Sequence, residues 1–176
     1  MGSPPFSFGG NNEIRRVVSG WLFLSSGHSQ HLQEVMVSRC TISSIKLRRV
    51  LICGDRLWTD LDCIKEKLLH WHTHMGGVLA IIEGEARGAD TLGCYAAEAF
   101  GIPVLKFPAD WGTFGKSAGP IRNRKMLTEG KPDVVLAFHN DIANSKGTKD
   151  MVKAAAKAGV EWHVYTQTGE ANVRIR

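Results

Sequence analysis

The sequence has no long hydrophobic run, no closely paired cysteines and no large excess of charge of one sign. Its longest apolar stretch, 17–24, is interrupted by Ser19 and Gly20 and falls short of the roughly 18 residues that a membrane-spanning helix needs. The four cysteines lack C-x-x-C spacing, which favours reduced structural thiols over a metal site or a disulfide framework. These absences predict a soluble, cytoplasmic protein with no membrane partner.

The net charge of +5 is unevenly divided along the chain. Residues 1–48 carry +3 of it, which leaves the remainder of the chain close to neutral. A nucleic-acid-binding surface needs clustered lysines and arginines with aromatic residues between them, and the sequence has no such cluster. The composition therefore disfavours nucleic acid as a partner, while a few basic residues remain available for a small anionic ligand.

The chain divides into one regular domain with an extension at each end. Residues 1–47 are rich in Ser and Gly and lack a sustained period, so we predict an irregular extension there. From residue 48 onward apolar runs alternate with helical patterns, and we predict a single domain over 48–166 and a tail over 167–176. With 43% hydrophobic residues the chain can build one sizeable core.

Buried strands and amphipathic helices alternate along this domain. We predict strands at 50–53, 78–82, 102–107, 134–138 and 161–165, and helices at 60–70, 89–100, 121–128 and 148–158. This alternation is typical of right-handed crossover units. The predicted fold is a Rossmann-like three-layer α/β sandwich with a mainly parallel five-stranded sheet, in which ligands bind beyond the carboxyl ends of the strands.

The segments that follow the predicted strands contain glycines, arginines and a tryptophan, which suit an anionic ligand with an aromatic base. Gly54 and Arg56 follow the first strand, and Glu83, Gly84, Glu85, Arg87, Gly88 and Asp90 follow the second. Trp111, Lys116, Gly119, Arg122 and Asn123 lie in the long connection 109–123, and Gly147 and Thr148 begin the last helix. Glycines allow close backbone approach, helix N-termini attract anions, and an indole can stack on a base.

Each of these segments also has a plainly structural interpretation. Asp90 lies in the first turn of its helix, with free backbone N–H groups beside it, and we favour a salt bridge to Arg87 there. Thr148 is predicted to cap the last helix. His70, His72 and His74 have no further ligand near them and are interpreted as a surface cluster, so we predict neither a metal nor a cofactor.

Several strings in these segments resemble the YspA-type (cpYpsA-related) branch of the SLOG superfamily. The most specific are A-R-G-A-D at 86–90 and A-G-P-I-R-N-R-K-M at 118–126, and the resemblance covers roughly 49–165. It implies a Rossmann-like domain that binds nucleotides or nucleotide-derived molecules, in many members within conflict systems. It also implies a possible homo-oligomer, in which subunits pair through their helical faces.

The LOG relatives in this superfamily hydrolyse the N-glycosidic bond of nucleoside monophosphates. Of their R-K-x-x-M signature this sequence keeps Arg122 and Met126, with Asn123 in place of Lys. Of their P-G-G-x-G-T-x-x-E signature it keeps Gly147 and Thr148, and the glutamate position is Met151. Methionine cannot stabilise an oxocarbenium-like transition state or activate water.

Two functions follow from these observations. The first is a sensor or processing domain that binds a nucleotide-like ligand, with phosphate on Arg87, Gly88 and the last helix and the base on Trp111. The alternative is a LOG-like phosphoribohydrolase, in which Arg122 positions the ribose phosphate and Glu83 or Glu85 replaces the missing glutamate. The loss of that glutamate favours the first.

Overall fold

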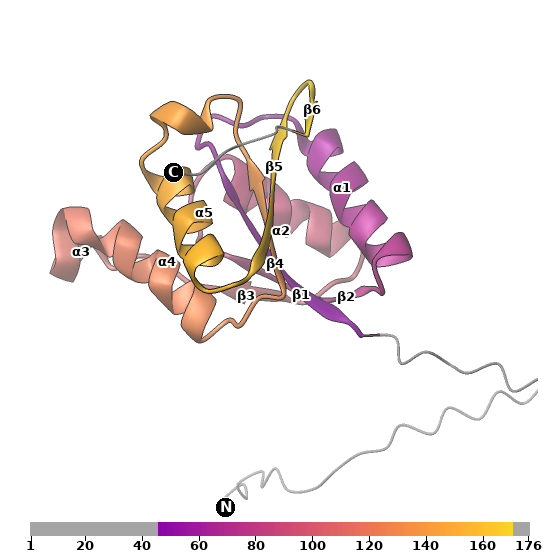
Figure 1. Ribbon diagram of the computed structural model, residues 1–176, viewed down its shortest axis with the longest axis horizontal. Coiled ribbons are helices and arrows are strands. Elements are labelled where there is room, and N and C mark those ends of the chain that lie inside the picture. The colour runs from indigo at the N-terminus through magenta and orange to yellow at the C-terminus, as the bar shows by residue number, and fades with distance from the viewer. Residues whose placement is uncertain (1–45, 171–176) are drawn as a thin grey trace, which may run out of the picture. The chain divides into compact units, whose positions relative to one another are not determined.

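Residues 46–170 are described by the computed structural model, and they form a six-stranded sheet covered on both faces by helices (Figure 1). The strand order is β3-β2-β1-β4-β5-β6, and all neighbours pair in parallel except β5 and β6. The strands are β1 Arg48–Gly54, β2 Val78–Glu83, β3 Val104–Lys106, β4 Val134–Phe138, β5 Glu161–Thr166 and β6 Gly169–Glu170. The five predicted parallel strands are confirmed, and the two-residue antiparallel β6 is an addition to them.

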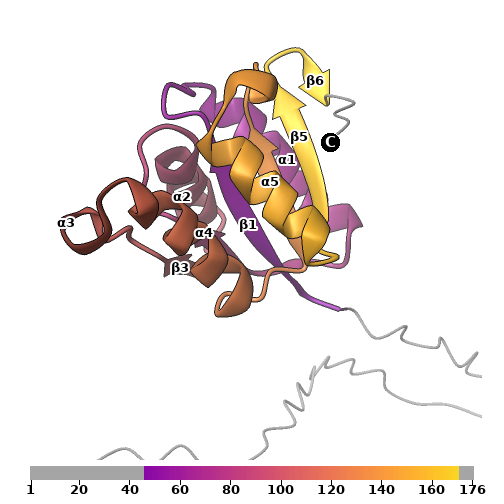
Figure 2. The same cartoon turned by 60° about the vertical axis from the view of Figure 1, so that its left-hand side comes forward.

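Two helices cover each face of the sheet, as expected for a doubly wound α/β fold. The helices are α1 Leu61–His74, α2 Ala89–Ala99, α3 Trp111–Phe114, α4 Ala118–Thr128 and α5 Gly147–Lys157. Side chains of α1 and α2 pack in one apolar layer, and side chains of α4 and α5 pack in the other. Figure 2 shows α4 and α5 in front of the sheet, with α1 behind it.

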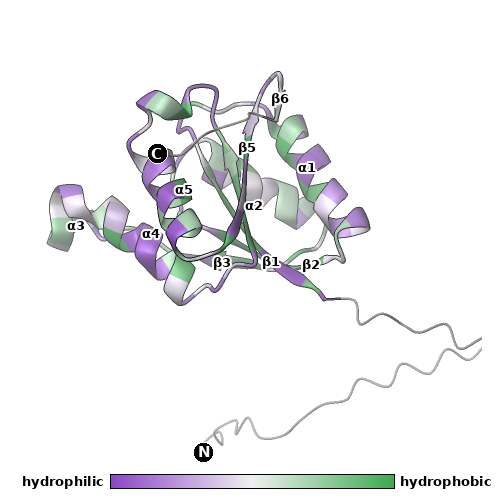
Figure 3. Ribbon diagram, in the orientation of Figure 1, coloured by the Kyte–Doolittle hydropathy of each residue, from purple (hydrophilic) through white to green (hydrophobic). Residues whose placement is uncertain are grey.

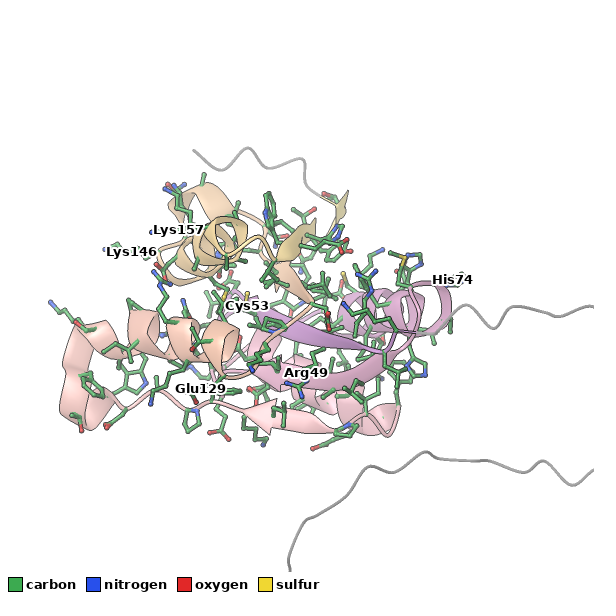
Figure 4. All side chains as sticks on the ribbon, turned by 60° about the horizontal axis from the view of Figure 1, so that its bottom comes forward. Arg49, Cys53, His74, Glu129, Lys146 and Lys157 are labelled. Atoms are coloured by element: carbon green, nitrogen blue, oxygen red, sulfur yellow. The ribbon has the colours of Figure 1, made fainter. Side chains whose placement is uncertain are left out.

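The central strands supply side chains to both layers. Along β1, Val50 and Ile52 belong to the layer of α1 and α2, whereas Leu51 and Cys53 belong to the layer of α4 and α5. Successive side chains of a strand point to opposite faces, so a strand buried on both sides must be apolar throughout. In Figure 3 the interior of the central strands is coloured hydrophobic, whereas hydrophobic and hydrophilic residues alternate along the helices. Burial also raises the pKa of the Cys53 thiol, which lies in the interior in Figure 4.

The structure corrects several predicted boundaries. The predicted strand 102–107 shortens to β3, because Pro103 has no N–H to donate to a neighbouring strand. The connection 109–123, predicted as a loop, contains α3 and a 3₁₀ turn at Gly115–Ser117, and α4 begins at Ala118 rather than 121. Pro120 then falls in the first turn of α4, where its missing N–H costs no helical hydrogen bond.

The predicted extension over 1–47 falls almost wholly outside the described residues, as do Cys40 and most of the tail over 167–176. Within residues 46–170 no helix is long and apolar enough to cross a membrane. The same residues contain no group of three or more His, Cys, Asp or Glu side chains placed to hold a metal ion. His70 and His74 stack on the exposed side of α1, with ring centroids 5.1 Å apart.

Candidate functional site

The carboxyl ends of β1, β2, β3 and β4 meet at one edge of the sheet. The chain order reverses direction at β1, which pairs with β2 on one side and with β4 on the other. Ligands of open α/β sheets bind at such a reversal, because the connections on its two sides run to opposite faces and leave a crevice. Two adjoining cavities lie along this edge, and predicted residues line both.

The first cavity, here called the tryptophan cavity, has a volume of about 340 Å³. It lies over the ends of β2 and β3 and brings together residues from four separate segments. Six predicted site residues line it: Arg56, Gly84, Glu85, Arg87, Trp111 and Arg122. Three arginines therefore face one small space, and a single carboxylate, that of Glu85, faces it with them.

The second cavity, here called the switch cavity, has a volume of about 320 Å³ and lies between the ends of β1 and β4. Four predicted residues line it: Gly54, Arg56, Gly147 and Thr148. Gly147 begins α5, so the N-terminal end of that helix borders the cavity, with the exposed Lys146 just before it (Figure 4). The unpaired N–H groups and the dipole at a helix N-terminus favour an anion at this place.

Arg56 connects the two cavities, since it lines both. Its guanidinium carbon lies 5.7 Å from the centroid of the Trp111 indole, within the range of a cation–π contact. Trp111 is 51% exposed and begins α3, where Asp110 caps the helix by accepting from the backbone N–H of Thr113. An aromatic face and an exposed cation are therefore available at the junction of the cavities.

Arg122 lines the tryptophan cavity and is held by two partners. Its Nη1 donates to the carbonyl oxygen of Gly84 and lies 3.4 Å from Oδ2 of Asp90. A Cβ at Gly84 would lie 1.5 Å from that nitrogen, so glycine at this position makes room for the guanidinium. Asp90 was predicted to pair with Arg87, and the structure shows Arg122 as its partner instead.

Asp90 is a buried carboxylate, 3% exposed. Burial raises its pKa to about 6, although Arg122 and the Gly84 N–H, 3.1 Å from Oδ2, favour the ionised form. Asp90 does not line either cavity. It acts on the site by holding Arg122, which supports its interpretation as a structural residue.

The two glutamates proposed as acid or base groups lie in different environments. Glu83 is 1% exposed, lines neither cavity and accepts a hydrogen bond at Oε2 from the backbone N–H of Glu85. Burial raises the pKa of Glu83. Glu85 is exposed, lines the tryptophan cavity and has Oε1 3.7 Å from Nζ of Lys106.

The start of α5 differs in detail from the prediction. Ser145 caps the helix by accepting at Oγ from the Thr148 N–H, 3.1 Å away, whereas Thr148 itself is buried. Met151, which occupies the LOG glutamate position, is buried in the apolar layer of α4 and α5. Asp150 accepts from both terminal nitrogens of Arg124, and from Nδ2 of Asn123 at 2.9 Å. Neither residue 150 nor residue 151 is therefore available to a ligand.

The remaining predicted residues have structural places. Gly88 lines a separate hollow beside Arg56 and Arg87, and a Cβ there would lie 2.2 Å from the carbonyl oxygen of Asp55. Asn123 is buried and links α4 to α5 through its hydrogen bond to Asp150. Gly119 lies in α4 beside Trp111, and Lys116 is exposed in the 3₁₀ turn before α4. The amides of Ala89 and Thr91 donate to the carbonyls of Asp55 and Ala86, so the start of α2 offers fewer N–H groups than predicted.

Some lining residues carried no strong signal in the sequence. Ala86, Pro108 and Ala109 line the tryptophan cavity, and Asp55, His139, Ser145 and Lys146 line the switch cavity. All of them follow the carboxyl end of a strand. The strand ends alone could have placed them at this edge, since parallel strands end on the same side of a sheet.

Comparison with known proteins gives matches of three kinds. The model of the YspA, cpYpsA-related SLOG family matches residues 48–114. The Gene 61 protein of Mycobacterium phage D29 is 36% identical over 119 residues, which cover 65% of this chain and 93% of that protein. The structure of DNA processing protein A (DprA) from Streptococcus pneumoniae is similar with a TM-score of 0.51 and 17% sequence identity, over 69% of this chain and 50% of that chain. The chain thus spans half the length of DprA, and this likeness shows the fold.

Proposed function

The chain belongs to the YspA, cpYpsA-related SLOG family, and from that premise we propose that it binds a nucleotide or a nucleotide-derived ligand. The ligand occupies the tryptophan and switch cavities at the carboxyl ends of the strands. The domain then acts as a sensor of that ligand or as a module that presents it for processing. Family membership supports a nucleotide-related function, and the cavities supply the residues for it.

The observation that carries the proposal is the pairing of an exposed indole with three arginines in one cavity. Arg56, Arg87 and Arg122 all line the tryptophan cavity with Trp111. Guanidinium groups match phosphate oxygens with two parallel hydrogen bonds, and an indole offers a flat apolar face to a base. Lys106 lies close to Glu85 and offsets its charge, so the lining remains favourable to an anion.

The phosphate of the ligand is proposed to lie toward the switch cavity. Lys146, Gly147 and Thr148 bring an ammonium group and the start of an eleven-residue helix to that cavity, and Arg56 reaches it from the turn after β1. The base then lies on Trp111. Arg122 is already bound to Gly84 and Asp90. It therefore adds a fixed positive charge beside the ligand, rather than a free guanidinium that could bind a phosphate with two hydrogen bonds.

Two aromatic residues of α3 provide the test with a built-in control. Trp111 and Phe114 are exposed to 51% and 44%, and of the two only Trp111 lines the tryptophan cavity. Stacking of a base on an aromatic ring contributes about 1–3 kcal/mol, which corresponds to roughly fivefold to a hundredfold in affinity. We therefore expect Trp111→Ala to weaken binding by that factor and Phe114→Ala to leave it unchanged.

The measurement is isothermal titration calorimetry with AMP, GMP, CMP, UMP, NAD and ADP-ribose, preceded by a thermal-shift screen of the same compounds. A ligand at a hundred times its Kd stabilises the native state by about 2.7 kcal/mol. Equal losses in the two variants would show that the indole does not contact the ligand. No binding of any compound to the unaltered protein would refute the proposal.

A second candidate function is hydrolysis of the N-glycosidic bond, and the position of Glu85 favours it. Glu85 is the carboxylate that lines the tryptophan cavity, whereas Met151 is buried away from it. A carboxylate near the ribose can stabilise an oxocarbenium-like state or activate water. Release of free base from nucleoside monophosphates, abolished in Glu85→Gln, would support this activity. Unchanged turnover in both Glu85→Gln and Glu83→Gln would exclude these two groups from the chemistry.

A further inference from the structure

Glu85 has a backbone conformation that a glutamate rarely adopts. Its φ is +54°, in the left-handed region, and among the non-glycine residues of 46–170 only Lys131, with φ +50°, shares this feature. The left-handed region costs free energy for a residue with a Cβ, and glycine adopts it without that cost. Strained residues of this kind cluster at ligand sites, where the side chain has a use that offsets the strain.

The turn that contains Glu85 is held from both sides. The backbone N–H of Glu85 donates to the buried carboxylate of Glu83, and the preceding Gly84 is fixed by Arg122 at its carbonyl and Asp90 at its N–H. Because these contacts involve only the backbone of residues 84 and 85, they do not require a carboxylate at position 85. A glycine there would satisfy the same turn.

The Glu85 side chain projects into a place that suits a sugar rather than a phosphate. It lines the tryptophan cavity among the arginines, on the segment between β2 and α2. One of its oxygens, Oε1, lies 3.7 Å from Lys106, and within residues 46–170 the other has no hydrogen-bond partner. An ionised carboxylate accepts hydrogen bonds and repels phosphate, so it can bind the sugar hydroxyls or the N–H groups of a base. With the base on Trp111, the ribose hydroxyls are the donors that we assign to Glu85.

We infer that Glu85 accepts hydrogen bonds from the ribose hydroxyls of the ligand and thereby selects ribonucleotides over 2′-deoxyribonucleotides. An acidic residue after the second strand of a dinucleotide-binding fold makes this kind of contact, and both ribose hydroxyls can reach the two oxygens of one carboxylate. The inference rests on the proposed function, because it names the class of ligand for the same site. The strained backbone is the consequence of placing a carboxylate where the turn favours glycine.

The test compares each nucleoside monophosphate with its 2′-deoxy form by calorimetry: AMP with dAMP, GMP with dGMP, CMP with dCMP and UMP with dUMP. A hydrogen bond to a charged acceptor corresponds to about tenfold or more in affinity, so we expect the ribonucleotide to bind at least tenfold more tightly. In Glu85→Gly, which has no acceptor at this position, this ratio falls close to one, and in Glu85→Gln, whose amide oxygen is an uncharged acceptor, it falls to an intermediate value. The affinity for the 2′-deoxy form stays the same or rises, because a negative charge has been removed.

Lys131→Gly is the matched control, since it relieves the other strained backbone at a residue that lines neither cavity. It should keep the ratio of the unaltered protein. Glu85→Gly should unfold at the same denaturant concentration as the unaltered protein or a higher one, whereas a structural role for the side chain would lower that midpoint.

The outcomes separate this inference from the proposed function. Binding of both forms with equal affinity would overturn the selection by Glu85 and leave nucleotide binding in place. A preference that persists in Glu85→Gly would also overturn it. Failure of all eight nucleotides to bind the unaltered protein would overturn the selection by Glu85, and failure of NAD and ADP-ribose as well would overturn the proposed function.

Discussion

The buried carboxylate of Asp90 makes the stability of this protein depend on pH between about 4 and 7. Burial raises the pKa of Asp90 from its ordinary value of 3.8 to about 6 in the folded state. The folded protein therefore binds this proton more tightly than the unfolded chain does. The resulting stability is fully present below about pH 3.8 and is lost as the pH rises through about 6. Between pH 7 and pH 5 the linkage relation gives a gain of about 1.4 kcal/mol.

The variant Asp90→Asn isolates this contribution, because asparagine keeps an oxygen for the Gly84 N–H and carries no charge. Urea unfolding at pH 5, 6 and 7 gives the free energy of unfolding of both proteins. We expect the unaltered protein to gain about 1.4 kcal/mol relative to the variant from pH 7 to pH 5. A difference that does not change with pH would refute the raised pKa. A difference of opposite sign would mean that Arg122 outweighs burial.

Three further predictions concern packing, the site and a helix cap. Leu68→Ala should cost about 2–5 kcal/mol in urea unfolding, because Leu68 is fully buried, whereas Leu69→Ala at the 46% exposed neighbour should cost under about 1 kcal/mol. Gly84→Ala should displace the Arg122 guanidinium, since a Cβ would overlap it, and weaken nucleotide binding about tenfold by calorimetry; unchanged affinity would remove Arg122 from the site. Asp60→Ala removes the cap of α1 and should lower the free energy of unfolding by about 1 kcal/mol, and a loss below about 0.3 kcal/mol would contradict that role.

The order of strands and helices could be predicted because its signals are local. The run 50–53 is apolar on consecutive residues, so both faces of that strand had to be buried. Asp60 precedes a helical pattern and caps α1. By contrast, α3 has only four residues and includes a glycine, so its apolar period is too short to be recognised.

The contacts inside the site could not be predicted, because they join residues far apart in the sequence. Asp90 and Arg122 are separated by 32 positions, and their pairing depends on how α2 and α4 pack on the sheet. The nearer Arg87 was the natural choice from the sequence alone. The left-handed backbone of Glu85 gave no signal either, because that conformation is normally indicated by glycine or asparagine.

The alternation of β1 between the two apolar layers has a consequence for how the domain unfolds. Val50 and Ile52 support the helices on one face, and Leu51 and Cys53 support those on the other. Detachment of either pair of helices from the sheet would expose one side of β1 to water. The two layers therefore melt as one cooperative unit, and the amide hydrogens of β1 should be among the last to exchange with solvent deuterium.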